Sequence, residues 1–125
     1  MNKRQVLSNK IKEVSLLTDR LGKPIDRGIK RAVALMQLHG IETTASCQGH
    51  KNWGLKHPWV QFKTDERVAK LLDECFRHQL DYLLEPPGSQ EQRLTFNTKE
   101  ALKVWNWFLF RVLDRQESLF EKSTK

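Results

Sequence analysis

Two pairs of short strand-type segments, each pair followed by a helical segment, constrain the fold of this chain more than any other feature. Runs rich in β-branched residues or with alternating apolar residues predict strands, over 41–45, 59–63, 80–84 and 93–96. Apolar residues at helical spacing predict helices, over 3–21, 27–39, 65–76 and 98–121. After an opening helix the order is therefore αββαββα. This order predicts an α+β, two-layer fold, with a mostly antiparallel four-stranded sheet and helices on one face.

Residues that start or stop helices mark the same boundaries. Gly22 ends the first helix, and Asp26 is suited to cap the second, which Gly40 then ends. Asn97, with Glu100 three residues later, resembles a capping box at the start of the last helix. These signals support the predicted element order independently of hydrophobic periodicity.

The length and composition predict one globular domain over residues 1–125, with residues 1–22 available as an interaction arm. At 125 residues the chain can bury one core, and 30% of its residues are charged. No apolar run approaches the roughly 20 residues that span a bilayer, so no membrane association is expected. The first residues lack the apolar block of a signal peptide, which favours a cytoplasmic location. Two cysteines without a secretory signal do not indicate a disulfide framework.

The formal net charge of +7 is distributed unevenly along the chain. Residues 1–31 contain nine basic and three acidic side chains, whereas residues 65–92 contain three basic and seven acidic ones. A one-sided basic surface attracts nucleic acid, nucleotides or an acidic partner. A solvated helix face that keeps the protein soluble explains the same pattern equally well.

The last helix, 98–121, carries apolar residues around nearly its whole circumference. A surface helix needs only one apolar stripe. Four short strands offer little area to cover the rest, so the sequence predicts a homodimer or larger homo-oligomer that forms through this helix.

The densest group of reactive and charged side chains lies in residues 44–62. Helix 27–39 rises by about 1.5 Å per residue, or roughly 18 Å. The following strand of about six residues returns over a similar distance, at about 3.3 Å per residue. The start of the helix should therefore lie beside the loop that follows the strand.

This juxtaposition predicts a site for an anion. A helix N-terminus favours negative charge, consecutive loop N–H groups add donors, and an indole ring can stack on a base. The predicted ligand-binding residues are Asp26, Arg27, Arg31, Ser46, Gln48, Gly49, His50, Lys51, Trp53 and Trp59. Helix capping by Asp26, solvated arginines and tryptophans that merely close the core are the structural alternative.

Three other hypotheses remain open for the same region. Cys47 near cations and His50 has the setting of a catalytic thiolate with its base. Cys47, His50 and His57 are ligand types for zinc, although their spacing matches no standard pattern, and no cofactor is predicted. The basic first helix is compatible with nucleic-acid binding. Cys75, within an apolar helical stripe, is expected in the core.

The run GIETTASCQGHKNWGLKHPWVQF, residues 40–62, resembles a family of small prokaryotic and phage-type proteins. That family has a Ser-Cys-Glu-Gly-His loop after a strand, followed by Trp-Gly and Pro-Trp-Val. Gln48 stands where the family pattern has Glu, so this chain lacks a carboxylate there. The resemblance implies a shared fold and site without supplying an activity.

A shorter stretch, residues 44–49, is similar to the loop of the tRNA wybutosine-synthesising methyltransferase family, which reads Ser-Cys-Ser-Gly-Arg. His50 stands where that family has Arg, and no function is transferred from so short a match. The sequence therefore favours a phosphate-containing small ligand, such as a nucleotide, bound between residues 26–31 and 46–59. An enzyme that uses Cys47 with His50 on a phosphorylated substrate and a nucleic-acid-binding protein are the alternatives.

Overall fold

The computed structural model describes residues 2–17, 25, 27–48, 57–76, 82–85, 91–116 and 120, without the side chains of residues 76 and 82–85. Its helices and strands follow one another as α1 (Lys3–Val14), α2 (Lys30–Leu38), β1 (Thr43–Cys47), β2 (Trp59–Lys63), α3 (Glu66–Phe76), β3 (Tyr82–Glu85), β4 (Glu91–Phe96) and α4 (Lys99–Arg111). A short 3-10 turn, Leu113–Arg115, follows α4. The predicted α+β class is confirmed.

The strands pair in the order β1-β2-β4-β3, and every pair is antiparallel. Successive side chains of a strand point to opposite faces. On β2 and β4 the buried side chains are Val60, Phe62, Leu94 and Phe96. Phe96 packs against Trp105 of α4, with ring centroids 5.9 Å apart, so these four side chains face the helices. The side chains between them, which include Trp59, lie on the opposite face.

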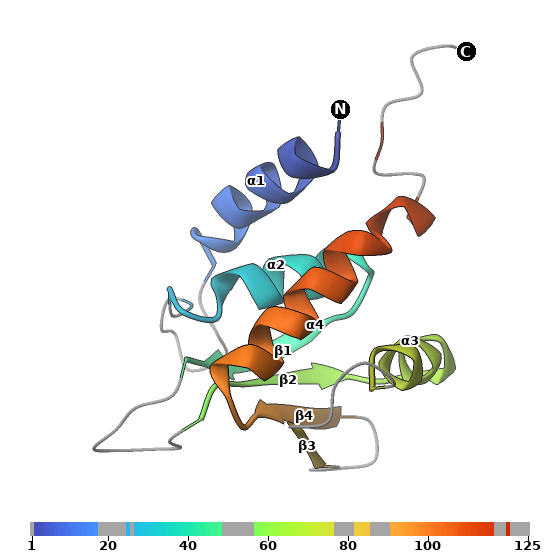
Figure 1. Ribbon diagram of the computed structural model, residues 1–125. Coiled ribbons are helices and arrows are strands. Elements are labelled where there is room, and N and C mark those ends of the chain that lie inside the picture. Colours follow the sequence, from blue (N-terminus) through green and yellow to red (C-terminus); the bar gives the residue numbers. More distant parts are fainter. Residues whose placement is uncertain are drawn as a thin grey trace.

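The helices are arranged in layers above the sheet (Figure 1). α2 contacts β1 and α4 contacts β4, and these two helices also contact each other. α1 packs against α2 on the side away from the sheet, while α3 lies beside one end of the sheet. The first helix contributes Val6, Leu7 and Val14 to the hydrophobic core, so it is an integral part of the packed structure.

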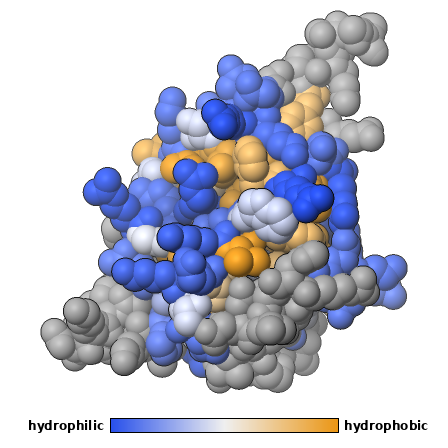
Figure 2. All heavy atoms as spheres, viewed as in Figure 1, coloured by the Kyte–Doolittle hydropathy of each residue, from blue (hydrophilic) through white to orange (hydrophobic). Residues whose placement is uncertain are grey.

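The face on which α1 and α4 are both visible has a mixed surface (Figure 2). Apolar side chains gather between the two helices, and hydrophilic side chains flank them on either side. On α4, Trp105, Phe108 and Leu109 are buried, whereas Trp107 remains 51% exposed. The neighbouring helices and β4 thus cover much of the apolar circumference of α4, and its use in a homo-oligomer remains a prediction.

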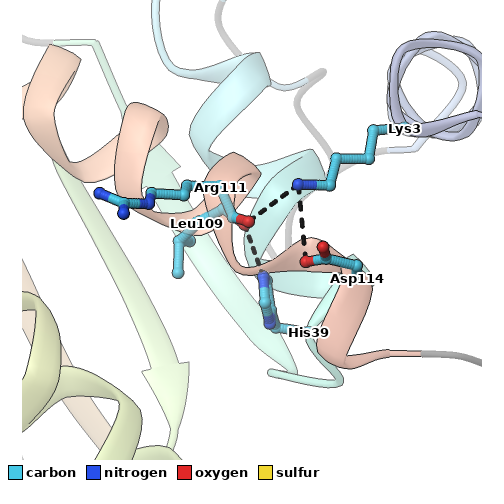
Figure 3. Close-up of polar contacts among 5 residues, drawn as sticks. All are labelled: Lys3, His39, Leu109, Arg111 and Asp114. Atoms are coloured by element: carbon cyan, nitrogen blue, oxygen red, sulfur yellow. Dashed lines mark hydrogen bonds and ion pairs between the residues drawn. The ribbon is translucent and has the colours of Figure 1, made fainter.

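Two side chains tie the C-terminal half of α4 to the rest of the protein (Figure 3). Lys3 of α1 donates a 2.8 Å hydrogen bond to the Arg111 carbonyl and lies 3.5 Å from the Asp114 carboxylate. The buried ring of His39 lies 2.8 Å, through Nε2, from the Leu109 carbonyl. Because Nε2 must donate in this pair, the bond assigns its proton to that nitrogen.

The C-terminal end of α2 is closed by a Schellman motif. The Gly40 N–H donates to Gln37, and the Ile41 N–H donates to Met36, at 2.9 and 3.0 Å. Gly40 has a φ of +78°, a conformation that side chains disfavour. Arg67 of α3 donates to the carbonyls of His39 and Gly40, at 2.7 and 3.1 Å. The predicted stop at Gly40 is confirmed.

Helix α1 ends earlier than the predicted boundary at residue 21. Its last helical residue is Val14, and Ser15 follows as the C-cap. The Ser15 hydroxyl donates to the Ile11 carbonyl at 2.8 Å, a local bond that competes with continuation of the helix. Leu17, predicted within the apolar stripe, is instead 42% exposed.

Three further boundaries differ from the predictions. The first strand begins at Thr43 rather than at Ile41, because the Ile41 N–H is used in the Schellman motif. The N-cap of α4 is Thr98, whose hydroxyl accepts from the Ala101 N–H, so the predicted cap at Asn97 is wrong. The last α-helix ends at Arg111, well before residue 121.

Candidate functional site

The start of the second helical segment lies against the end of β1, as the chain geometry predicts. The backbone N–H of Gly28 donates a 2.8 Å hydrogen bond to Oε1 of Gln48. A Cβ atom at position 28 would lie 2.7 Å from that oxygen and 2.9 Å from the Gln48 Cβ. Only glycine therefore allows this close approach, and the two segments are joined at this point.

The helix begins later than predicted, which changes what its N-terminus offers. Residues 27–29 form a turn, and α2 starts at Lys30 with Ile29 as its N-cap. An isoleucine side chain cannot accept a hydrogen bond, and Ile29 makes no cap bond. Arg27 is exposed in this turn. The predicted cap, Asp26, lies outside the described residues.

Cys47 and Trp59 face each other across the first two strands. Their Cα atoms are partners in the β1–β2 register, so both side chains lie on the sheet face opposite the helices. The Arg93 guanidinium lies 5.7 Å from the centroid of the Trp59 ring. An aromatic ring with an adjacent cation is thus present near the end of β1, on a neighbouring strand.

Five of the ten predicted ligand-binding residues lie outside the residues that the structure describes: Asp26, Gly49, His50, Lys51 and Trp53. Ser46 lies within β1 and lines a cavity of about 520 Å³, together with Ile25 and with residues of α2, β2 and β4. The structure therefore describes the junction at Gly28 and Gln48 and one flank of the predicted site.

Arg31 lies in a different environment from the one that its spacing from Arg27 indicates. It lines a cavity of about 570 Å³ with residues of α1 and α4. Arg4 and Lys12 of α1 line the same cavity. Sequence reasoning missed this cluster, although the spacing of Arg4, Leu7, Ile11 and Lys12 along one helix was a signal that could have indicated it.

The thiol and metal hypotheses gain no geometric support. Cys47 is half-buried as the last residue of β1, whereas His50 lies outside the described residues. Within the described segments, no group of three or more histidine, cysteine or acidic residues is placed to hold a metal ion. Cys75 is buried in the core, as predicted. Burial raises the pKa of its thiol to about 12, so the thiol stays protonated.

Comparison with known proteins adds no relative to these observations. No family model, no curated protein and no solved structure matches the chain. None of the described helices has the length and apolar content that crossing a bilayer requires. Any functional conclusion must therefore come from the chain's own residues.

Proposed function

We propose that the protein binds a phosphate-containing small ligand, such as a nucleotide, where the start of the second helical segment meets the end of β1. The pocket is formed by residues 26–31 and 46–59. The observation that carries this proposal is the 2.8 Å hydrogen bond between the Gly28 N–H and Gln48. It brings together two segments that are both rich in cations and backbone donors.

The charges of these two segments favour an anion. Residues 26–31 contain Arg27, Lys30 and Arg31 against a single acid, and residues 46–59 contain two lysines and two histidines without an acid. The N-terminal end of α2 adds the positive end of a helix dipole. Arg27, which is exposed beside Gly28, is the described side chain best suited to contact a phosphate.

Trp59, the register partner of Cys47, supplies an aromatic surface at the end of the sheet where β1 ends. An indole ring stacks on a nucleobase in a sequence-tolerant manner, which contributes about 1–3 kcal/mol. Arg93 already lies against this ring and strengthens such a platform by a cation–π contact. A nucleotide, with a base for the ring and a phosphate for the cations, therefore fits the residues better than inorganic phosphate does.

Calorimetric titration of the full chain with inorganic phosphate, AMP and ADP tests the proposal. We expect saturable binding that strengthens from phosphate to the nucleotides. Arg27→Ala should weaken all three ligands, because it removes a phosphate contact. Trp59→Leu should weaken the nucleotides alone, and Trp59→Phe should retain most of their affinity.

A matched control separates local contacts from general charge. Lys103 is an exposed cation on α4 that pairs with Glu100, away from the proposed pocket. Lys103→Ala removes the same charge as Arg27→Ala and should leave binding unchanged. Absence of binding, or equal losses in these two variants, would refute the proposed site.

A further inference from the structure

A second cavity, separate from the junction of Gly28 and Gln48, lies among three helices. Its volume is about 570 Å³, which is within the range of small-molecule sites. It is lined by α1, by Arg31 of α2 and by Phe110 of α4. It belongs to the surface between α1 and α4 where apolar side chains gather between hydrophilic ones (Figure 2).

The floor of this cavity is apolar. Leu7 is buried, and Ile11 and Phe110 are partly buried and pack against the hydrophobic core. These side chains are anchored by the core behind them, so the cavity does not depend on an exposed loop. The apolar body of a ligand would pack on this floor and remove the remaining exposed surface of Ile11 and Phe110 from water.

The rim of the cavity is cationic. Arg4, Lys12 and Arg31 line it and are exposed, and none of the described residues that line it is acidic. Arg4 and Lys12 are eight residues apart on α1, so about 12 Å of helix axis separates them, with Leu7 and Ile11 between. Two of the three cations are arginines, whose planar guanidinium groups suit phosphate and carboxylate oxygens.

Lys3 marks one end of the interface between α1 and α4. Its ammonium lies 5.6 Å from the Phe110 ring centroid but bonds to the Arg111 carbonyl and to Asp114. This contact closes the α1–α4 interface at that end (Figure 3). Lys3 itself does not line the cavity, whose cations are Arg4, Lys12 and Arg31.

We propose that this cavity binds an amphipathic anion, a small molecule with an apolar body and a phosphate or carboxylate group. The apolar part lies on Leu7, Ile11 and Phe110, and the anionic group binds to the arginines and Lys12. Arg31 borders both proposed sites, because it belongs to residues 26–31 and also lines this cavity. The apolar floor and the α1 cations Arg4 and Lys12 belong to this cavity alone.

Calorimetry with decyl phosphate, below its micellar concentration, tests this assignment on the full chain. We expect one saturable site per chain. Decanol lacks the anionic group and inorganic phosphate lacks the apolar body, so each should bind at least tenfold more weakly. Equal affinity for decanol and decyl phosphate would contradict the role of the cationic rim.

Reversing the charges of the α1 cations provides a second test of the proposal. Both Arg4 and Lys12 are exposed, so the double variant Arg4→Glu/Lys12→Glu should fold and should lose at least tenfold in affinity for decyl phosphate. The control Lys99→Glu/Lys103→Glu changes the net charge equally at exposed positions of α4 and should bind normally. Unchanged binding in the α1 double variant would overturn the proposal.

Two more measurements distinguish this cavity from the nucleotide pocket and from a lipid-binding surface. Arg27→Ala should leave decyl phosphate binding intact, so a failure of the nucleotide proposal does not affect this one. Vesicles of phosphatidylglycerol and phosphatidylcholine test the alternative of a lipid surface. Binding to these vesicles without a one-to-one decyl phosphate site would overturn the small-molecule assignment.

Discussion

The two ends of α2 are held in very different ways. At its C-terminal end, Gly40 closes a Schellman motif, Arg67 bonds to two carbonyls, and the buried His39 ring bonds to Leu109. At its N-terminal end, the described polar tie to β1 is the bond from the Gly28 N–H to Gln48. Both residues of this bond and the neighbouring Arg27 are exposed.

This difference indicates that the C-terminal end of α2 contributes mainly to stability, whereas its N-terminal end is available for binding. A buried bond whose loss leaves an unsatisfied partner is costly, whereas an exposed bond is readily replaced by water. The C-terminal end should therefore respond to substitution mainly through the free energy of unfolding. The N-terminal end retains donors and cations that can contact a ligand without a large cost to the fold.

Arg67→Met should give the largest loss of stability among these contacts. It removes a charged donor from the His39 carbonyl, in a partly buried bond, and from the Gly40 carbonyl, in an exposed one. Because bonds to a charged group are stronger than neutral ones, we expect a loss of about 2 kcal/mol. Urea unfolding followed by circular dichroism measures it. Lys70→Met removes an exposed cation from the same helix and should cost less than about 0.5 kcal/mol. Equal losses would show that Arg67 acts only through general charge.

Gly40→Ala should cost about 1–2 kcal/mol, the usual penalty for a side chain in the left-handed region. The new Cβ would also lie 3.1 Å from Nη2 of Arg67. Gly40→Asn should lose less, because asparagine tolerates this conformation better than alanine does. Denaturant unfolding of the two variants gives their order of stability. A Gly40→Ala variant as stable as the wild type would contradict the role of the positive φ.

His39 should make the C-terminal end sensitive to acid. Burial lowers its pKa from 6.5, and Arg115 and Arg67 lower it further, while the bond to the Leu109 carbonyl opposes the shift. Below pH 6.5 the unfolded chain therefore binds a proton that the folded chain does not. The free energy of unfolding should fall as the pH decreases from 6.5 toward the lower folded pKa.

Unfolding curves between pH 7 and pH 5 measure this effect. His39→Gln keeps an N–H donor but does not titrate, so its stability should vary less with pH over this range. A wild-type slope in His39→Gln would place the acid sensitivity elsewhere.

Local signals in the sequence predicted the fold well where they act over a few residues. The spacing of Ile29, Val33 and Met36 identified the buried face of α2, and Gly40 identified its end. The first helix was predicted too long because periodicity alone does not register the bond that the Ser15 hydroxyl donates to the Ile11 carbonyl. Leu17 continues the apolar spacing although the helix has already ended.

Most contacts between residues far apart in the chain could not be predicted from the sequence. The bond between Lys3 and Arg111 joins residues 108 positions apart, and that between His39 and Leu109 joins residues 70 apart. The contact of Gly28 with the end of β1 was predicted from element lengths. The second helical segment and the strand that follows it are of similar length and run in opposite directions, so the end of the strand lies near the start of the helix. The packing of α1, which gives Arg31 its neighbours, follows no such local rule.

The smallest effect is expected at the N-terminal end of α2, at Gln48. Gln48→Ala removes the acceptor of the exposed Gly28 N–H, and we expect a loss of about 0.5–1 kcal/mol. Gln48→Glu keeps an oxygen at the same position, and its negative charge lies near a helix N-terminus, so it should be at least as stable as the wild type. Thermal unfolding of the two variants measures the ranking.

The same pair separates a structural role of this oxygen from a role in binding. A carboxylate beside Gly28 repels a phosphate, so Gln48→Glu should weaken binding of ADP while it preserves the fold. Gln48→Ala, which adds no charge, should weaken ADP less than Gln48→Glu does. If both variants bind ADP equally and unfold at the same temperature as the wild type, Gln48 neither joins the two segments nor borders an anion site.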